Sequence, residues 1–295
     1  MAATQDDIRG ADFLHWSKKH YENFTVVSLL LPRRLRRPVR LLYAYCRYVD
    51  DLGDEAPGDR LARLDAFEQD LERCYGGTPR HPLLQTFQPV IVQYGLPRGE
   101  LWALIEANRM DQVVRRYETF SDLVHYCRHS AMPVGRLFLK LLGYDDARRI
   151  QLSDATRTGL QLVNFLQDVG EDYEKGRIYL PGDDMARFGV SEEHIARRDA
   201  TPEFRTLMQF EADRARALLY AGLPLAETVE GLARVDVRLF SYGGLAVLDA
   251  LADARYDVFG RRVRVGKLRK AGLFLRAALW LLRSRRLPPW KGECR

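Results

Sequence analysis

The chain has 295 residues, of which 46% are hydrophobic and 29% charged, with 46 Lys and Arg against 40 Asp and Glu. These values are typical of a folded globular protein and exclude intrinsic disorder, a collagen-like repeat and, with four scattered cysteines, a disulfide scaffold. The charge is uneven, because residues 261–295 hold twelve basic residues and one acidic residue, whereas residues 1–260 hold 34 basic and 39 acidic residues. An acidic body therefore carries a strongly basic tail.

Apolar residues recur at intervals of three and four along most of the chain, which predicts helices. The pattern is clear over 35–46, 61–71, 160–167 and 245–251. Short segments rich in Gly and Pro at 76–79, 94–97, 142–145 and 180–183 are expected to be turns between helices. Strand-like alternation is nearly absent. The sequence therefore predicts an all-α protein of about ten helices, with one domain over 1–266 and a basic amphipathic helix and tail over 267–295.

The first acidic cluster, YVDDLGDE at 48–55, ends one of these helical runs. Asp50 and Asp54 are four residues apart, so both carboxylates lie on one face of a helix, one turn apart. The second cluster, DVGED at 168–172, repeats the spacing in Asp168 and Asp172. With Asn164 they form a polar stripe on an otherwise apolar helix.

Like charges at this spacing repel one another, which favours a cation that offsets the repulsion. Oxygen-only ligands select hard divalent ions such as Mg²⁺, and Mg²⁺ commonly shares its coordination with substrate phosphates. The two stripes therefore predict a site that binds a diphosphate through metal ions. The alternative is that both clusters are solvated helix faces, which are common in helical proteins.

Three segments resemble motifs of the squalene/phytoene synthase family of class I isoprenoid synthases. Residues 43–47, YAYCR, leading into the first aspartate pair, resemble its first aspartate motif, and 123–127, LVHYC, resemble its central tyrosine motif. Residues 161–181, QLVNFLQDVGEDYEKGRIYLP, resemble its second aspartate motif. The resemblance covers about residues 20–270 and implies a single-domain helical bundle with a central active-site cavity.

The resemblance also implies roles for individual residues. Tyr126, Arg47 and His20 would act beside the reacting carbons. The diphosphate would be bound by His20, Arg47, Gln161 and Asn164. Several Mg²⁺ ions bridging the diphosphate would be held by Asp50, Asp54, Asn164, Asp168 and Asp172, with Asp51 and Glu171 as further candidates.

Within the family, local details resemble the bacterial branch of hopanoid pathways that converts presqualene diphosphate and water into hydroxysqualene. Members that join two prenyl diphosphates usually carry Arg before the second-motif aspartate, where this chain has Gln167. Glu171, however, is an acid found in the condensing type. A condensing enzyme that makes presqualene diphosphate, or a squalene- or phytoene-type product, is the alternative, and a non-catalytic assembly factor of the same fold is a third.

The sequence lacks the motifs of two further kinds of ligand site. It contains no Gly-rich dinucleotide motif, so no NADPH site is expected. It also lacks nucleic-acid-binding motifs, so no nucleic-acid partner is expected. The scattered cysteines, the absence of a signal peptide and the resemblance to bacterial enzymes together predict the bacterial cytoplasm. The oligomeric state is not predicted.

The basic tail has two interpretations. Leu273, Phe274, Ala277, Leu281 and Leu282 are expected to share one helical face, and basic residues flank it: Lys267, Lys270, Arg283, Arg285 and Arg286. This pattern is typical of a helix that lies on an anionic membrane surface, here through residues 267–286 at the inner face of the cytoplasmic membrane. The alternative is a final helix that packs on the domain while its long basic side chains extend to water.

Overall fold

The computed structural model describes residues 31–260 and 263–284, with some side chains of the last helix left out. Within these ranges every regular element is a helix, and an isolated bridge pairs Arg116 with Ile178. The predicted all-α class is therefore confirmed. The described residues gather into two compact units, 31–115 with 121–150, and 116–120 with 151–260 and 263–284. His20 lies outside the described residues.

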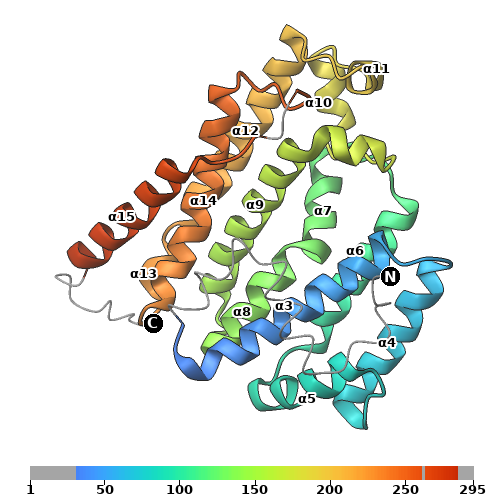
Figure 1. The fold of residues 1–295 in the computed structure, drawn as a ribbon, viewed down its shortest axis with the longest axis vertical. Helices are drawn as coiled ribbons and strands as arrows, with labels where there is room; N and C mark the ends of the chain where they lie inside the picture. Colours follow the sequence, from blue (N-terminus) through green and yellow to red (C-terminus); the bar gives the residue numbers. More distant parts are fainter. Residues whose placement is uncertain (1–30, 261–262, 285–295) are drawn as a thin grey trace. The chain divides into compact units, whose positions relative to one another are not determined.

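The first unit is drawn from blue to green in Figure 1. Its helices are α3 (Arg33–Asp54), α4 (Arg60–Gly76), α5 (Pro82–Tyr94), α6 (Arg98–Val113), α7 (Phe120–Ser130) and α8 (Met132–Leu142).

Short turns separate these helices where the sequence predicts them. After α3, Gly58 adopts a positive φ of 80°, and the Asp59 carboxylate then caps α4 by accepting from the Ala62 amide at 3.0 Å. Gly95 and Gly143 end α5 and α8 in the left-handed conformation, which glycine adopts without a steric penalty. The predicted turns at 76–79, 94–97 and 142–145 are thus confirmed.

An aromatic core holds the first unit together. The Tyr45 ring is completely buried, 5.8 Å from the ring of Phe67 and 5.7 Å from that of Phe87, and its hydroxyl donates to the Leu101 carbonyl at 2.8 Å. Because α3 contributes Tyr45 to this core, the opposite side of its C-terminal half is left to carry polar residues.

The second unit contains α9 from residue 151 and the helices that follow it, drawn from yellow-green to red in Figure 1. Its helices are α9 (Ala147–Glu174), α10 (Gly182–Arg187), α11 (Glu192–Ala196), α12 (Pro202–Gly222), α13 (Leu225–Thr228), α14 (Ala233–Asp253) and α15 (Lys267–Ser284). The described residues form more helices than the ten or so expected, because α10, α11 and α13 have only four to six residues. Such short helices leave no readable apolar period.

Glycines allow close helix contacts in this unit. A Cβ at Gly222 would lie 1.9 Å from Thr156 Oγ1, and one at Gly244 would lie 2.8 Å from a methyl of Leu219. These contacts bring α12 against α9 and α14 against α12. Among the described helices, none is both long and apolar enough to cross a bilayer.

Candidate active site

The first aspartate stripe lies on the last turns of α3. Asp50 is exposed and Asp54 half-buried, whereas Asp51, on another face, is buried. The Arg47 guanidinium lies 2.8 Å from the Asp51 carboxylate and 3.1 Å from that of Glu55. The helix therefore separates its acids: Asp51 is used in an ion pair with Arg47, while Asp50 and Asp54 remain one turn apart as predicted.

Two amide side chains of α6 support this end of α3. Asn108 Nδ2 donates to Asp50 Oδ1 at 3.4 Å, and Gln112 Nε2 donates to the Gly53 carbonyl at 3.0 Å. A Cβ on Gly53 would lie 2.1 Å from Asn108 Oδ1, so glycine is required for this approach. Asn108 and Gln112 are not among the residues predicted from the sequence. Their spacing with Asp111, which places all three on one side of α6, is the signal that could have found them.

The Asp50 carboxyl sits in a mixed environment. Water reaches its side chain, yet the surrounding protein desolvates it and raises its pKa to about 7. The Asn108 hydrogen bond and the positive charge of Arg47 oppose this rise, and the nearby charges of Asp54 and Asp51 add to it. Because like charges and desolvation both disfavour the ionised form, this position suits a nearby cation.

Tyr126 is buried in α7 and donates from its hydroxyl to Asp111 Oδ2 at 2.8 Å. Asp111 belongs to the same side of α6 as Asn108. The same side of α6 therefore contacts two of the predicted site residues, Asp50 through Asn108 and Tyr126 through Asp111. Asp111 is a further residue that the sequence analysis did not single out.

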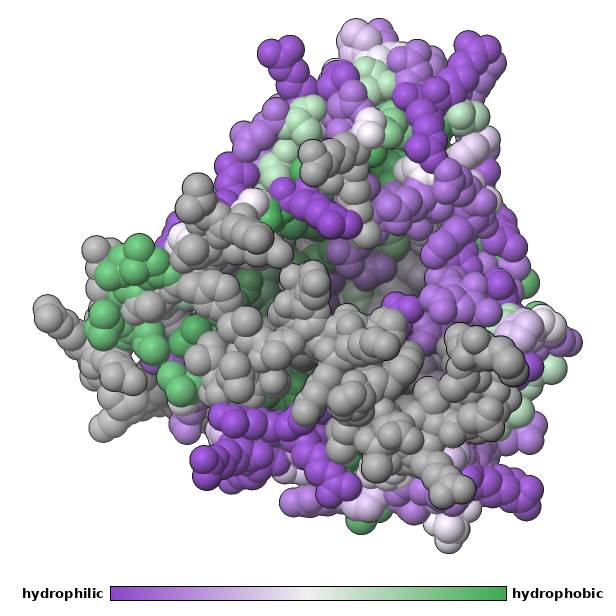
Figure 2. Space-filling model, viewed as in Figure 1, coloured by the Kyte–Doolittle hydropathy of each residue, from purple (hydrophilic) through white to green (hydrophobic). Residues whose placement is uncertain are grey.

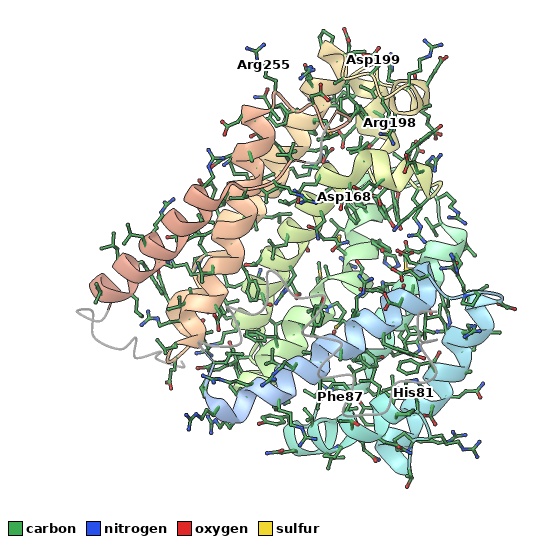
Figure 3. All side chains as sticks on the ribbon, viewed as in Figure 1. His81, Phe87, Asp168, Arg198, Asp199 and Arg255 are labelled. Carbon is green, nitrogen blue, oxygen red and sulfur yellow. The ribbon has the colours of Figure 1, made fainter. Side chains whose placement is uncertain are left out.

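The second aspartate stripe lies on α9 in the second unit. Asn164 is exposed, and Gln161, Asp168 and Asp172 are half-buried, while Leu162, Val163 and Phe165 between them are buried. Figure 3 shows Asp168 on the long α9 helix. The predicted polar stripe on an apolar helix is thus confirmed for this unit. Glu171 is exposed beside it.

Residues 175–181 follow α9, and stacked aromatic rings hold this segment against the helix. The Tyr179 ring lies 4.0 Å from that of Phe165 and nearly parallel to it, and the Tyr117 ring stacks on Tyr179 at 5.6 Å. Arg116 Nη1 donates to the Gly176 carbonyl at 2.7 Å and its guanidinium pairs with Glu192. The end of α9 that carries Asp168 and Asp172 is therefore held in place.

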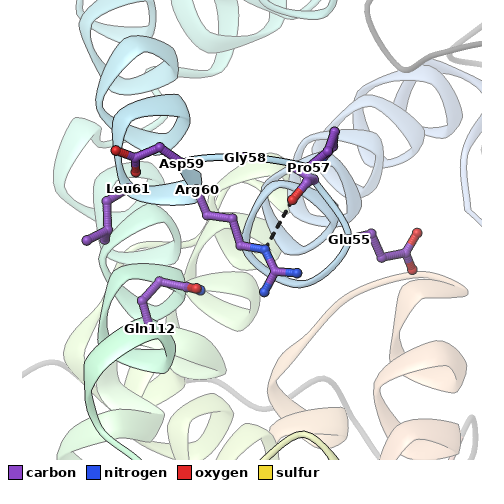
Figure 4. Close-up of a pocket in the computed structure, with 8 residues that line it drawn as sticks. Glu55, Pro57, Gly58, Asp59, Arg60, Leu61 and Gln112 are labelled. Carbon is purple, nitrogen blue, oxygen red and sulfur yellow. Dashed lines mark hydrogen bonds between the residues drawn. The ribbon is translucent and has the colours of Figure 1, made fainter.

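A pocket of about 520 Å³ opens just beyond the first aspartate stripe (Figure 4). Its wall is formed by the connection from α3 to α4, the start of α4 and one residue of α6, and its lining residues are Glu55, Ala56, Pro57, Gly58, Asp59, Arg60, Leu61 and Gln112. It does not include the residues predicted to bind the diphosphate. The predicted central cavity therefore stays a prediction.

Each aspartate stripe can be tested for its fit to a metal ion. Among residues 31–260 and 263–284, no group of three or more His, Cys, Asp or Glu side chains is arranged to hold a metal. Each stripe by itself offers two carboxylates one turn apart. Mg²⁺ is commonly held by one or two carboxylates, with phosphate oxygens and water completing the shell. The donors therefore fit Mg²⁺ shared with a diphosphate better than a site closed by protein alone.

Known proteins resemble the chain over most of its length. A family model described as squalene/phytoene synthase matches residues 17–269. The chain belongs to the squalene/phytoene synthase family. This family consists of isoprenoid synthases, which act on prenyl diphosphates.

Individual members of the family differ in the reaction that their names state. A solved structure called squalene synthase HpnC, from Alicyclobacillus acidocaldarius, is 43% identical, with a TM-score of 0.81, covering 85% of this chain and 95% of that one. A hydroxysqualene synthase of Rhodopseudomonas palustris is 35% identical, over 83% of this chain and 82% of its own. A 15-cis-phytoene synthase of Synechococcus elongatus is 31% identical, over 85% and 86%.

Proposed function

We propose that this squalene/phytoene synthase family member is a Mg²⁺-dependent hydroxysqualene synthase. It would convert presqualene diphosphate and water into hydroxysqualene and diphosphate. The relative named hydroxysqualene synthase, at 35% identity, supports this branch of the family. The solved structure at 43% identity is named squalene synthase, which is a condensing reaction.

The observation that carries the proposal is the position of Gln167. Its Nε2 donates to the Val263 carbonyl at 2.7 Å. Condensing members of the family usually carry Arg at this position. A neutral amide engaged with a backbone carbonyl supplies no positive charge for a second diphosphate. The residue beside Asp168 therefore supports a site that handles one diphosphate.

In this proposal Mg²⁺ would be held by Asp50, Asp54, Asn164, Asp168 and Asp172 of the two aspartate stripes. The bound ions would neutralise the charge of the departing diphosphate. Loss of diphosphate breaks the carbon–oxygen bond and leaves a carbocation. After rearrangement, water adds to that cation and releases a proton, which balances the reaction.

The protein's own side chains have defined tasks in this scheme. Arg47 is held against Asp51 and Glu55, so its positive charge is fixed on the same helix as Asp50. Tyr126, whose hydroxyl is held by Asp111, would offer its aromatic ring to stabilise positive charge on carbon. Gln161 and Asn164 lie on α9 with Asp168 and would donate hydrogen bonds to the diphosphate. His20 keeps its proposed diphosphate contact, although it lies outside the described residues.

The alternative is a condensing synthase that makes presqualene diphosphate or a phytoene-type product. Glu171, an acid on the exposed side of the second stripe, favours this candidate. The phytoene synthase at 31% identity has nearly the same coverage as the hydroxysqualene synthase. Either reaction is proposed for the bacterial cytoplasm, which is consistent with the buried, unpaired thiols of Cys74 and Cys127.

Product analysis separates the two candidates. We expect purified protein incubated with presqualene diphosphate and Mg²⁺, without NADPH, to release diphosphate and form an alcohol whose oxygen comes from H₂¹⁸O. Mass spectrometry detects the two-mass-unit increase. Farnesyl diphosphate and geranylgeranyl diphosphate serve as parallel substrates. Turnover of either of these, with none of presqualene diphosphate, would replace the proposal with the condensing alternative.

Asn108 supplies a test of the first aspartate stripe. We expect Asn108→Ala to lower the rate of diphosphate release roughly tenfold to a hundredfold and to raise the Mg²⁺ concentration that gives half the maximal rate, because Asp50 loses its oriented donor. Steady-state rates over a Mg²⁺ titration measure both effects.

The matched control is Gln85→Ala in the same unit. Gln85 Nε2 donates to the Pro79 carbonyl at 3.1 Å, so this variant loses an amide-to-carbonyl hydrogen bond, as Asn108→Ala does at Leu104 (3.1 Å), but far along the chain from the aspartates. Both variants are expected to lose about 1 kcal/mol of stability. An equal Mg²⁺ requirement in the two variants would show that Asn108 has only a structural role.

A further inference from the structure

The outer face of α15 exposes three leucines. Leu275, Leu279 and Leu282 are 63%, 47% and 60% exposed, and their spacing of four and three places them on one side of the helix. Figure 2 shows hydrophobic residues, in green, gathered at the left edge of the molecule where α15 ends. A contiguous apolar strip on a surface helix marks an interaction site more often than isolated exposed residues do.

The opposite face of α15 is already occupied, because the helix packs along α14. Ala277 is completely buried, and Trp280 lies under the guanidinium groups of Arg234 and Arg238, at 4.8 and 4.1 Å. Of the five residues predicted to share one face, Ala277 is on the packed side, Leu273 and Leu281 are half-buried and Leu282 is exposed, while the Phe274 side chain lies outside the described ones. That face is therefore wrong as a lipid-facing side, and the alternative prediction of a helix that packs on the domain is confirmed for it. The helix packs on the protein and still presents a second apolar side to solvent.

Charge identifies the kind of partner that this leucine face fits. The α15 sequence contains five basic residues and no acid, and residues 261–295 contain twelve basic residues and one acid. A second copy of the chain would bring the same positive charge to the contact and be repelled. Leucines have no complementary group on a nucleic acid. An anionic lipid surface matches both features, since its headgroups attract the basic residues and its acyl chains accept the leucines.

We propose that α15 docks the Leu275–Leu279–Leu282 face onto an anionic lipid bilayer and lies in the plane of its surface. The helix binds with its axis parallel to the membrane, because the packed face remains on α14 and the leucines lie on the side facing away. This docking proposal is separate from the proposed reaction, because it does not depend on which prenyl diphosphate the protein uses.

Vesicle co-sedimentation tests the proposal without any substrate. We expect the wild-type protein to bind phosphatidylglycerol-containing vesicles, to bind pure phosphatidylcholine vesicles much less, and to dissociate as salt is raised. The double variant Leu275→Gln/Leu282→Gln is expected to bind the anionic vesicles at least tenfold more weakly. The control is Val92→Gln/Val113→Gln, which removes two equally exposed apolar side chains, each 69% exposed, in the first unit.

Circular dichroism and thermal unfolding of each variant establish that α15 remains folded. Equal vesicle binding by wild type and by Leu275→Gln/Leu282→Gln would overturn the proposal, as would failure of the wild type to bind anionic vesicles. Analytical ultracentrifugation supplies a third outcome: a dimer that Leu275→Gln/Leu282→Gln dissociates would assign the leucine face to a second copy. Because diphosphate release is measured separately, failure here leaves the proposed reaction standing.

Discussion

Replacing Asp168 or Asp50 with asparagine is expected to reduce diphosphate release by roughly a thousandfold while leaving the helical content unchanged. In either variant one stripe keeps a single carboxylate, and the neutral amide that replaces the other gives a much weaker Mg²⁺ ligand than an ionised acid. The loss is expected in the maximal rate even at high Mg²⁺, because the charge of the departing diphosphate is no longer neutralised. Release of diphosphate from presqualene diphosphate measures it.

The matched control for this experiment is Asp154→Asn, on the same helix as Asp168 but more than three turns before it. It removes an equal charge from α9 and should leave the rate within about twofold of the wild type. Near-normal turnover in Asp168→Asn, or an equal loss in Asp154→Asn, would contradict the proposal that the two stripes bind the metal.

The second large effect concerns stability. Asp236 lies in the first turn of α14 and is completely buried, and neither of its carboxylate oxygens has a hydrogen-bond partner among residues 31–260 and 263–284. Burial away from water raises its pKa to about 8. We expect Asp236→Asn to stabilise the protein at pH 9, because the variant no longer buries a negative charge.

The sign and the pH range follow from linkage. A carboxyl whose pKa is higher in the folded than in the unfolded state contributes most to stability below about pH 4, where it is protonated in both states. That contribution is lost as the pH rises from about 4 to about 8. The rise of the Asp236 pKa to about 8 corresponds to an upper limit of about 5 kcal/mol. Local opening that admits water reduces the effect, so we expect on the order of 3 kcal/mol at pH 9 and little difference at pH 4.

Urea unfolding of wild type and Asp236→Asn at several pH values measures this difference. Asp249→Asn on the same helix is the control, because Asp249 is half exposed and pairs with Arg216 at 2.9 Å. It should lose a few tenths of a kcal/mol at every pH above 5. A stability difference between Asp236→Asn and wild type that does not change with pH would show that the Asp236 carboxylate is not the cause.

Much of the fold could be predicted because it depends on local patterns. The apolar spacing over 35–46 and 160–167 identifies α3 and α9, and the Gly and Pro segments mark where helices end. Asp50 and Asp54 could be paired because four residues make one turn of any helix. Such inferences need no knowledge of what a helix packs against.

The remaining features depend on contacts between distant parts of the chain. Asn108 could not be linked to Asp50, because 58 residues separate them and neither residue type predicts the presence of the other. An aspartate in the first turn of a helix normally faces water, so the sequence gives no sign that Asp236 is buried. Similarly, both sides of α15 are apolar, and only its contact with α14 decides which leucines remain exposed.

The length of α9 has a consequence for how a ligand would be received. Its 28 residues run without a break, so Asn164, Asp168 and Asp172 are set at intervals of about 6 Å along a rigid rod before anything binds. Donors carried on loops would have to lose conformational freedom at the moment of binding. Here that entropy is already lost when the protein folds, so the proposed diphosphate and its cations would meet a preorganised row of oxygen atoms. A ligand whose charges are spaced differently would have to bind without any adjustment of this row.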